Sequence, residues 1–220
     1  MIQIQYKFFI GDDRITKAGY NHKLFIKLVH EQLTLQAMTQ FPHDSIKPFS
    51  QEGKKKEQVG KMFDSIAGKY DFMNWFLSAG IDKSWRTRAI EELISDNPQH
   101  ILDVATGTGD MAIRAAKILD PQKITGIDIS EKMLEIGRKK VDTEGLTNII
   151  ELQSGDSETI KFPSNTFDGV MVAFGVRNFE NLQLGLTEIL RVMKPGAKLV
   201  VLEFSKPKAG LINHYTFLIS

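Results

Sequence analysis

The sequence predicts an α/β fold with a doubly wound, mostly parallel sheet, and three observations support this. Beyond residue 98, short apolar runs of strand length alternate with longer amphipathic segments of helical period. Glycine and proline stand at most of the junctions, where chains turn. Strands separated by helices pair in parallel through right-handed crossovers, so helices cover both faces of the sheet.

The composition is that of a globular domain with a full-sized core. The chain has 220 residues, of which 42% are hydrophobic and 25% charged, and its formal net charge is +1. We therefore expect no nucleic-acid partner, because no strong basic field is present. The absence of cysteine excludes disulfides and thiolate metal sites and fits a cytoplasmic protein. The five histidines are scattered, so we expect no metal site.

The amino-terminal part of the chain divides in two. Residues 1–50 form a poorly patterned extension and linker, within which His22–Met38 fits one amphipathic helix. Residues 51–97 form a helical cap, which ends near Asn97 because a proline follows. We expect the lysine run 54–56 to be the solvated start of the first cap helix. Apolar side chains recur on one face of that helix at i, i+3, i+4 and i+7, namely Val59, Met62, Phe63 and Ile66.

Residues 98–220 carry the predicted sheet domain. Ser130 fits the N-cap of one helix, and Gly145 follows the end of that helix. Residues 194–196, Lys-Pro-Gly, fit a turn before the fifth strand. The expected elements are strand 100–104, helix 111–119, strand 123–127, helix 131–144, strand 149–152, strand 167–174, helix 182–192 and strand 198–204.

A glycine-rich loop follows the first of these strands, in the stretch LDVATGTGD from Leu102 to Asp110. Doubly wound sheets bind ligands at the carboxyl ends of their strands, and glycines let the backbone approach a ligand closely. Gly107 and Gly109, with Asp128 about twenty residues later, match the dinucleotide-binding pattern. An NAD-dependent oxidoreductase is therefore one candidate.

The carboxylates around this loop favour a different cofactor, S-adenosylmethionine (AdoMet). Asp103 and Asp110 flank the loop. Asp128 and Asp156 follow the second and third strands, and Ser157 stands beside Asp156. Such charges repel a pyrophosphate but attract the ammonium and sulfonium groups of AdoMet. Asp128 would accept hydrogen bonds from the ribose hydroxyls and Asp156 from the adenine amino group, whereas the alternative for each aspartate is a helix cap.

Four segments resemble the class I AdoMet-dependent methyltransferases, which have a Rossmann-like sheet: LDVATGTGD, GIDIS, FDGVMVAFGVRNF and EILRVMKPGAKLVVLEFSKP. MFDSIAGKYDFMN and FGVRNF resemble more narrowly the MenG/UbiE family, the C-methyltransferases of demethylmenaquinone and ubiquinone biosynthesis. The similarity covers about residues 62–207. It implies methylation of a ring carbon of a polyprenyl hydroquinone, foremost demethylmenaquinol to menaquinol. It also implies AdoMet contacts through Thr108, Asp128, Asp156 and Ser157.

The chain departs from this family in three places. Ala105 stands where the methyltransferase loop often has glycine. The chain ends at Ser220, whereas family members continue with two further strands, so we expect carboxyl-terminal strands to be missing and a sheet edge to be uncovered. A non-catalytic AdoMet-binding protein is therefore an alternative function. Residues 1–37 have no counterpart in the family, which is consistent with a start codon assigned too early.

The resemblance places the acceptor side of the site at FGVRN, after the fourth strand. A hydroquinone becomes a carbon nucleophile when a hydroxyl group loses its proton. We expect Arg177 to hold the developing oxyanion, Asn178 to orient the hydroxyl group or a water, and Tyr70 of the cap to share in proton removal. The alternatives are a surface salt bridge for Arg177 and a packing role for Tyr70.

The aromatic part of the cap predicts a binding surface for the polyprenyl tail. Burying each tail methylene is worth about 0.8 kcal/mol, although the same residues also fit a plain core. Because such a substrate lives in the membrane, we expect a cytoplasmic protein with the option of transient contact at the membrane surface. The sequence leaves the oligomeric state open. The expected tail-binding residues are Phe72, Trp75, Phe76, Leu77 and Ile81.

Overall fold

The computed structural model describes residues 48, 53–78, 81–203 and 217–219, with only the backbone for 71–78 and 217–219. The predicted helix His22–Met38 lies outside the described residues. The side chains of four expected tail-binding residues, Phe72, Trp75, Phe76 and Leu77, lie outside them too. The fifth, Ile81, is 52% exposed.

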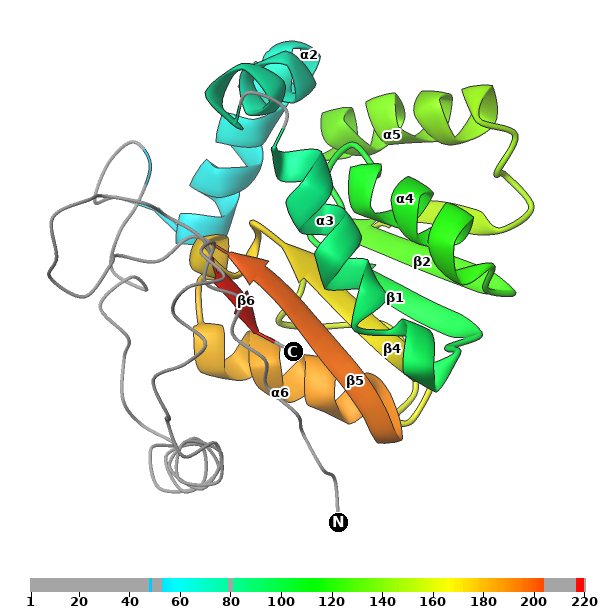
Figure 1. Ribbon diagram of the computed structural model, residues 1–220. Coiled ribbons are helices and arrows are strands. Elements are labelled where there is room, and N and C mark those ends of the chain that lie inside the picture. Colours follow the sequence, from blue (N-terminus) through cyan, green and yellow to red (C-terminus); the bar gives the residue numbers. More distant parts are fainter. Residues whose placement is uncertain (1–47, 49–52, 79–80, 204–216, 220) are drawn as a thin grey trace, which may run out of the picture.

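A six-stranded sheet runs through the molecule (Figure 1). Its strands are β1 (His100–Val104), β2 (Lys123–Asp128), β3 (Ile150–Ser154), β4 (Phe167–Ala173), β5 (Met193–Glu203) and β6 (Phe217–Ile219). Their order is β3-β2-β1-β4-β5-β6; the pairs from β3 to β5 are parallel, and β6 is antiparallel to β5. The strand order reverses between β1 and β4, which is where such sheets open a crevice.

Helices cover both faces of the sheet and its carboxyl edge. The helices α3 (Asp82–Glu91), α4 (Asp110–Leu119) and α5 (Glu131–Thr143) lie on one face, and α6 (Leu182–Val192) lies on the other (Figure 1). The long helix α2 (Lys55–Ser78) lies across the carboxyl ends of the strands. Two short 3-10 turns complete the described elements, η2 (Ile94–Asp96) and η3 (Val176–Asn178).

Local sequence signals explain where these helices begin. The Ser130 hydroxyl caps α5 by accepting a hydrogen bond from the Met133 amide at 3.3 Å. The Asn181 side chain caps α6 by accepting one from the Leu184 amide at 2.9 Å. Gly109 precedes α4 with a φ of +78°, a left-handed conformation that glycine adopts without a Cβ clash.

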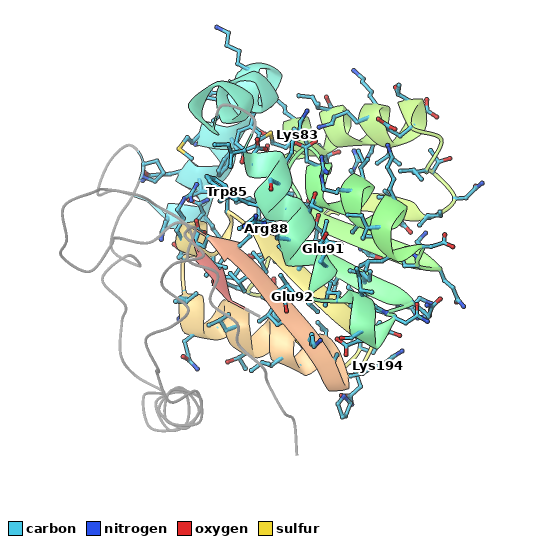
Figure 2. All side chains as sticks on the ribbon, in the orientation of Figure 1. Lys83, Trp85, Arg88, Glu91, Glu92 and Lys194 are labelled. Atoms are coloured by element: carbon cyan, nitrogen blue, oxygen red, sulfur yellow. The ribbon has the colours of Figure 1, made fainter. Side chains whose placement is uncertain are left out.

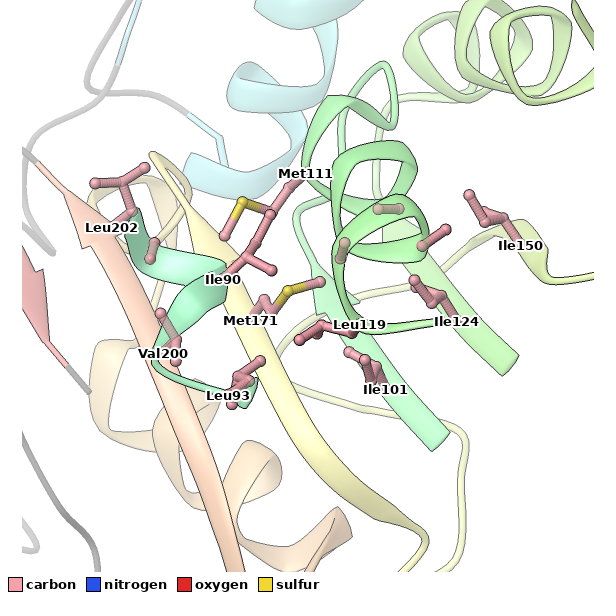
Figure 3. Packing of buried hydrophobic residues seen from close by; sticks show 14 of the residues in the cluster. Ile90, Leu93, Ile101, Met111, Leu119, Ile124, Ile150, Met171, Val200 and Leu202 are labelled. Carbon is pink, nitrogen blue, oxygen red and sulfur yellow. The ribbon is translucent and has the colours of Figure 1, made fainter. Parts of the chain in front are cut away.

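Each face of the sheet has its own apolar core. One cluster joins α3 and α4 to the sheet, and in it Ile90, Ile101 and Met171 are fully buried (Figure 3). The second cluster packs α6 against the opposite face, where Leu102 and Ile189 are fully buried. Ile101 and Leu102 are neighbours in β1, so the alternation of side chains along a strand supplies both cores.

The helix α3 separates its buried face from a solvent face. Ala89 and Ile90 are fully buried, whereas Lys83, Arg88 and Glu91 are exposed on the outside of the helix (Figure 2). The expected helix toward Asn97 is interrupted, because α3 ends at Glu91 and the chain continues through η2. Among the described helices, none has both the length and the apolar character that crossing a bilayer requires.

The predicted doubly wound, mostly parallel sheet is confirmed, and the first four strands lie within two residues of their expected bounds. The fifth strand begins earlier than expected, at Met193. The expected turn at 194–196 is an irregularity within β5, where the register against β4 shifts and Gly196 has a φ of +86°. At the sheet edge where strands were expected to be missing, one short antiparallel strand, β6, pairs with β5.

Candidate active site

A pocket opens at the carboxyl ends of the strands, on both sides of the point where the strand order reverses. Its volume is about 650 Å³, including the space at its mouth. Gly107 lines it from the loop after β1, Asp128 from the end of β2, Asp156 from the loop after β3 and Asn178 from the turn after β4. Because ligands of open α/β sheets bind at this position, the pocket is the candidate active site.

The glycine loop after β1 takes a tight conformation. Ala105 and Gly107 both have a φ of +56°, and the Thr106 amide donates to the Ile127 carbonyl at 3.0 Å. The left-handed conformation costs a residue with a Cβ about 1–2 kcal/mol, which explains why related loops often carry glycine where Ala105 stands. The Ala105 methyl group also constrains its neighbour, since a Cβ at Gly175 would lie 2.5 Å from it.

Asp128 closes β2 and presents a fixed carboxylate to the pocket. Its Oδ2 accepts a hydrogen bond from the Gly107 amide at 2.8 Å, and its Oδ1 accepts one from the Ser130 amide at 2.8 Å. Burial raises the pKa of the Asp128 carboxyl group, and these amide hydrogen bonds oppose the rise. A carboxylate has about four acceptor positions, so Asp128 retains acceptor capacity for a ligand.

Asp103 lies behind the glycine loop and is 1% exposed. Its Oδ2 accepts a hydrogen bond from the Thr106 hydroxyl at 2.7 Å, which holds the loop from below. Burial raises the pKa of Asp103 to about 7, although the Thr106 hydrogen bond and the positive charge of Arg86 lower it. Arg86 is itself only 7% exposed and pairs loosely with Asp82, at 3.7 Å from Nε to Oδ2.

Lysines partly neutralise the acids around the pocket. Lys56 Nζ lies 3.0 Å from Asp156 Oδ2, and this hydrogen bond raises the pKa of the lysine amino group. Lys140 pairs with Asp110 and also contacts the Thr108 hydroxyl at 3.2 Å. The negative field at these acids is therefore smaller than the sequence predicts, because α2 and α5 each bring a lysine to one of them.

Glu158 is a buried acid at the rim of the pocket that no motif in the sequence marks. It lines the pocket and is 8% exposed. Its Oε1 accepts a hydrogen bond from the Asn181 amide at 2.7 Å, so it ties the loop after β3 to the start of α6. Burial raises the pKa of the Glu158 carboxyl group, and the hydrogen bond from Asn181 opposes the rise.

Two polar side chains of α2 tie this helix to the loops around the pocket. Asp64 Oδ1 accepts a hydrogen bond from the Ser130 hydroxyl at 2.6 Å. Lys55 Nζ donates to the Phe179 carbonyl at 2.8 Å and to the Arg177 carbonyl at 3.2 Å. Lys55 is 3% exposed, so the prediction of a solvated lysine run is wrong for this residue.

Aromatic side chains form the upper wall of the pocket. Phe63 and Tyr70 of α2 line it and meet edge to face, with ring centroids 5.8 Å apart and an interplanar angle of 76°. Phe174 lines the pocket from the end of β4 with a φ of +58°, which is strained for a bulky residue. The Arg86 guanidinium carbon lies 5.2 Å from the centroid of the Phe174 ring and supports it from behind.

The turn after β4 carries both residues expected on the acceptor side. Asn178 lines the pocket, and its Nδ2 donates to the Phe174 carbonyl at 3.4 Å. The Arg177 side chain is 46% exposed and pairs with Glu203. This is the surface salt bridge that was the alternative to a catalytic role for Arg177. Arg177 therefore stands at the edge of the site, with its guanidinium turned to β5.

The structure gathers most of the predicted site residues around one pocket. Those that line it are Tyr70, Gly107, Asp128, Asp156, Ser157 and Asn178. The other three lie outside the lining: Asp103 and Thr108 are buried behind the loop, and Arg177 points to Glu203. The helical spacing in the sequence also indicates where two lysines of α2 lie. Lys55 and Lys56 precede Val59 by four and three residues, so all three lie on the same side of the helix.

Comparison with known proteins decides what kind of site this is. Residues 51–218 match the model of the ubiE/COQ5 methyltransferase family. The chain belongs to this family. The demethylmenaquinone methyltransferase of Bacteroides fragilis is 52% identical over 167 residues, which are 76% of this chain and 68% of that protein. The ubiquinone/menaquinone biosynthesis C-methyltransferase UbiE of Geotalea daltonii is 45% identical over 161 residues, 73% of this chain and 68% of that protein.

Solved structures of other proteins have the same fold as this chain. The cyclase SpnF superposes with a TM-score of 0.63 at 26% identity, over 70% of this chain and 63% of that one. A Methanococcus maripaludis protein assigned to the AdoMet-dependent methyltransferases superposes with a TM-score of 0.53 at 25% identity, over 70% of this chain and 67% of that one. Family and fold together decide between the two cofactors that the glycine loop left open, in favour of AdoMet.

Proposed function

We propose that the chain transfers the methyl group of AdoMet to a ring carbon of a polyprenyl hydroquinone, foremost demethylmenaquinol, in menaquinone or ubiquinone biosynthesis. Relatives named for these methylations support the reaction class. One observation carries the proposal. A single pocket joins the acids after β2 and β3 to the aromatic side of α2 and to the turn after β4.

The cofactor side of this pocket fits AdoMet. AdoMet supplies a methyl group on a sulfonium, which is electrophilic without further activation by the protein. In this proposal Asp128 accepts hydrogen bonds from the ribose hydroxyls with its free acceptor positions, and Asp156 and Ser157 meet the adenine. Gly107 lets the cofactor lie against bare backbone. Asp103 keeps its place behind the loop and shapes it.

The acceptor side lies between α2 and the turn after β4. Tyr70 takes part in removing the hydroquinone proton, and Asn178 orients the hydroxyl group. The ring carbon would then take the methyl group while S-adenosylhomocysteine leaves. Loss of the ring hydrogen as a proton and return of a proton to the ring oxygen would restore the hydroquinone. Arg177 stabilises the oxyanion after leaving Glu203, a movement that its half-exposed side chain permits.

We also propose that the tail of the substrate brings the enzyme into transient contact with the membrane surface. A polyprenyl chain stays in the bilayer, and each methylene that the protein buries is worth about 0.8 kcal/mol. We propose that the cap, residues 51–97, receives the first isoprene units while the sheet domain, residues 98–220, holds the cofactor. The protein then works in the cytoplasm and contacts the membrane only transiently.

Methyl transfer with isotope-labelled AdoMet tests the proposal. The chain is incubated with short-tail demethylmenaquinol, with the corresponding ubiquinone precursor, or with neither acceptor as the control. We expect label on the ring of at least one acceptor, together with an equal amount of S-adenosylhomocysteine. Tight AdoMet binding without label on either acceptor would instead assign the chain a non-catalytic, AdoMet-binding role.

A further inference from the structure

Lys55 is a buried lysine in the first turn of α2, far in the sequence from the groups that it contacts. Lys55 is 3% exposed, and a buried ammonium group is stable only when it has hydrogen-bond partners. Its Nζ donates to the carbonyls of Phe179 at 2.8 Å and Arg177 at 3.2 Å, and its backbone amide donates to Glu180 Oε1 at 2.7 Å. Three contacts therefore join one residue of α2 to one turn of the chain.

The turn that Lys55 holds is η3 and the residues after it. The two carbonyls that accept from Nζ belong to the residues on either side of Asn178. A short 3-10 turn has poor hydrogen-bond geometry of its own. Here the Asn178 amide donates to the Gly175 carbonyl at 2.9 Å, and its side chain donates to Phe174 at 3.4 Å. Contacts from outside the turn therefore decide how firmly its side chains are placed.

We infer that Lys55 is a positioning residue for methyl transfer, an inference that rests on the proposed function. It sets the backbone on both sides of Asn178 and fixes the distance between this turn and α2, the helix that carries Tyr70. The Lys55 ammonium group donates to carbonyls of the turn after β4, whereas the groups proposed to hold AdoMet lie after β1, β2 and β3. Removing the ammonium group therefore acts on turnover and spares cofactor binding.

The absence of cysteine from the chain allows a chemical rescue. Lys55→Met removes the ammonium group but keeps a long side chain. Lys55→Cys adds the sole thiol, which 2-bromoethylamine converts into a lysine analogue with sulfur in place of one methylene. Alkylation is done in denaturant before refolding, and the wild type receives the same treatment. Lys54→Met, at the exposed neighbouring position, is the matched control.

We expect Lys55→Met to lower kcat for demethylmenaquinol about 10- to 100-fold, as loss of alignment does. Its AdoMet Kd should stay within about two-fold of the wild type, a split that general unfolding does not produce. Lys54→Met should change neither constant, and alkylation of the Lys55→Cys protein should restore most of kcat. An unchanged kcat in Lys55→Met, a parallel loss of AdoMet binding, or a failed rescue of refolded protein would each overturn the inference.

A second readout separates this inference from the proposed function. If the wild type methylates neither quinol, the proposed function fails, and hydrogen exchange still tests the placement of the turn. Amides of residues 176–180 should then exchange about ten-fold faster in Lys55→Met than in Lys54→Met, and alkylation of the Lys55→Cys protein should slow them again. Equal exchange in the two variants would overturn the role of Lys55 in holding the turn.

Discussion

The buried carboxyl group of Asp103 gives the fold a pH dependence that a single substitution removes. In the folded protein burial raises the pKa of this group to about 7, against an ordinary value of 3.8. The folded state therefore holds a proton that the unfolded chain releases. The protonated Asp103 therefore makes its full contribution to the unfolding free energy below about pH 4. This contribution is lost as the pH rises through 7.

The size of the effect follows from the two pKa values. Each unit of difference corresponds to about 1.4 kcal/mol, so the whole range is worth about 4 kcal/mol and the window from pH 5 to pH 8 about 3 kcal/mol. Asp103→Asn keeps an acceptor for the Thr106 hydroxyl but cannot ionise. Relative to the wild type, the variant should therefore gain about 3 kcal/mol of unfolding free energy between pH 5 and pH 8.

Urea unfolding at several pH values measures this difference directly. The other titrating groups are common to both proteins, so they cancel when one curve is subtracted from the other. Glu135→Gln, at an exposed position of α5, is the control for the loss of one surface carboxylate. Parallel curves for the wild type and Asp103→Asn would contradict a raised pKa for Asp103, because they would mean that this group is already ionised in the folded protein at pH 5.

Three further substitutions test the site. Gly137→Ala should destabilise the fold by about 1–2 kcal/mol in urea unfolding and weaken AdoMet binding. The added Cβ would lie 2.6 Å from Leu152 Cδ1 and 3.1 Å from the Thr108 carbonyl carbon. A variant more stable than the wild type would contradict this packing. Asp128→Asn should raise the AdoMet Kd about 10- to 100-fold by calorimetry, as loss of a charged acceptor does, and a Kd within about two-fold would remove Asp128 from the cofactor site. Arg177→Ala should lower turnover about 100-fold with AdoMet binding intact, and unchanged turnover would leave the Glu203 ion pair as its whole role.

The sequence was sufficient for the sheet and for the residues at the strand ends. Apolar runs located β1 to β4, and the rule that ligands bind where the strand order reverses brought Gly107 and Asp128 to one pocket. It was insufficient where long-range contacts decide. Lys55 is buried by carbonyls more than 120 residues away, and no local pattern predicts such partners. The orientation of Arg177 likewise depends on Glu203 of a later strand.

Backbone strain shows the same limit at finer scale. The sequence shows that Ala105 stands in the glycine loop. Its positive φ and the close approach of Gly175 to its methyl group follow only from the packing of two loops. Charge patterning was also incomplete for this reason. In the sequence Asp110 and Asp156 have no adjacent basic residue. In the structure Asp110 pairs with Lys140 of α5, and Asp156 pairs with Lys56 of α2.

A calorimetric comparison of S-adenosylhomocysteine with NADH tests most directly what the strand-end pocket is built to hold. We expect S-adenosylhomocysteine to bind one site per chain and NADH to give no binding heat at the same concentrations. Tight NADH binding without any S-adenosylhomocysteine binding would contradict it.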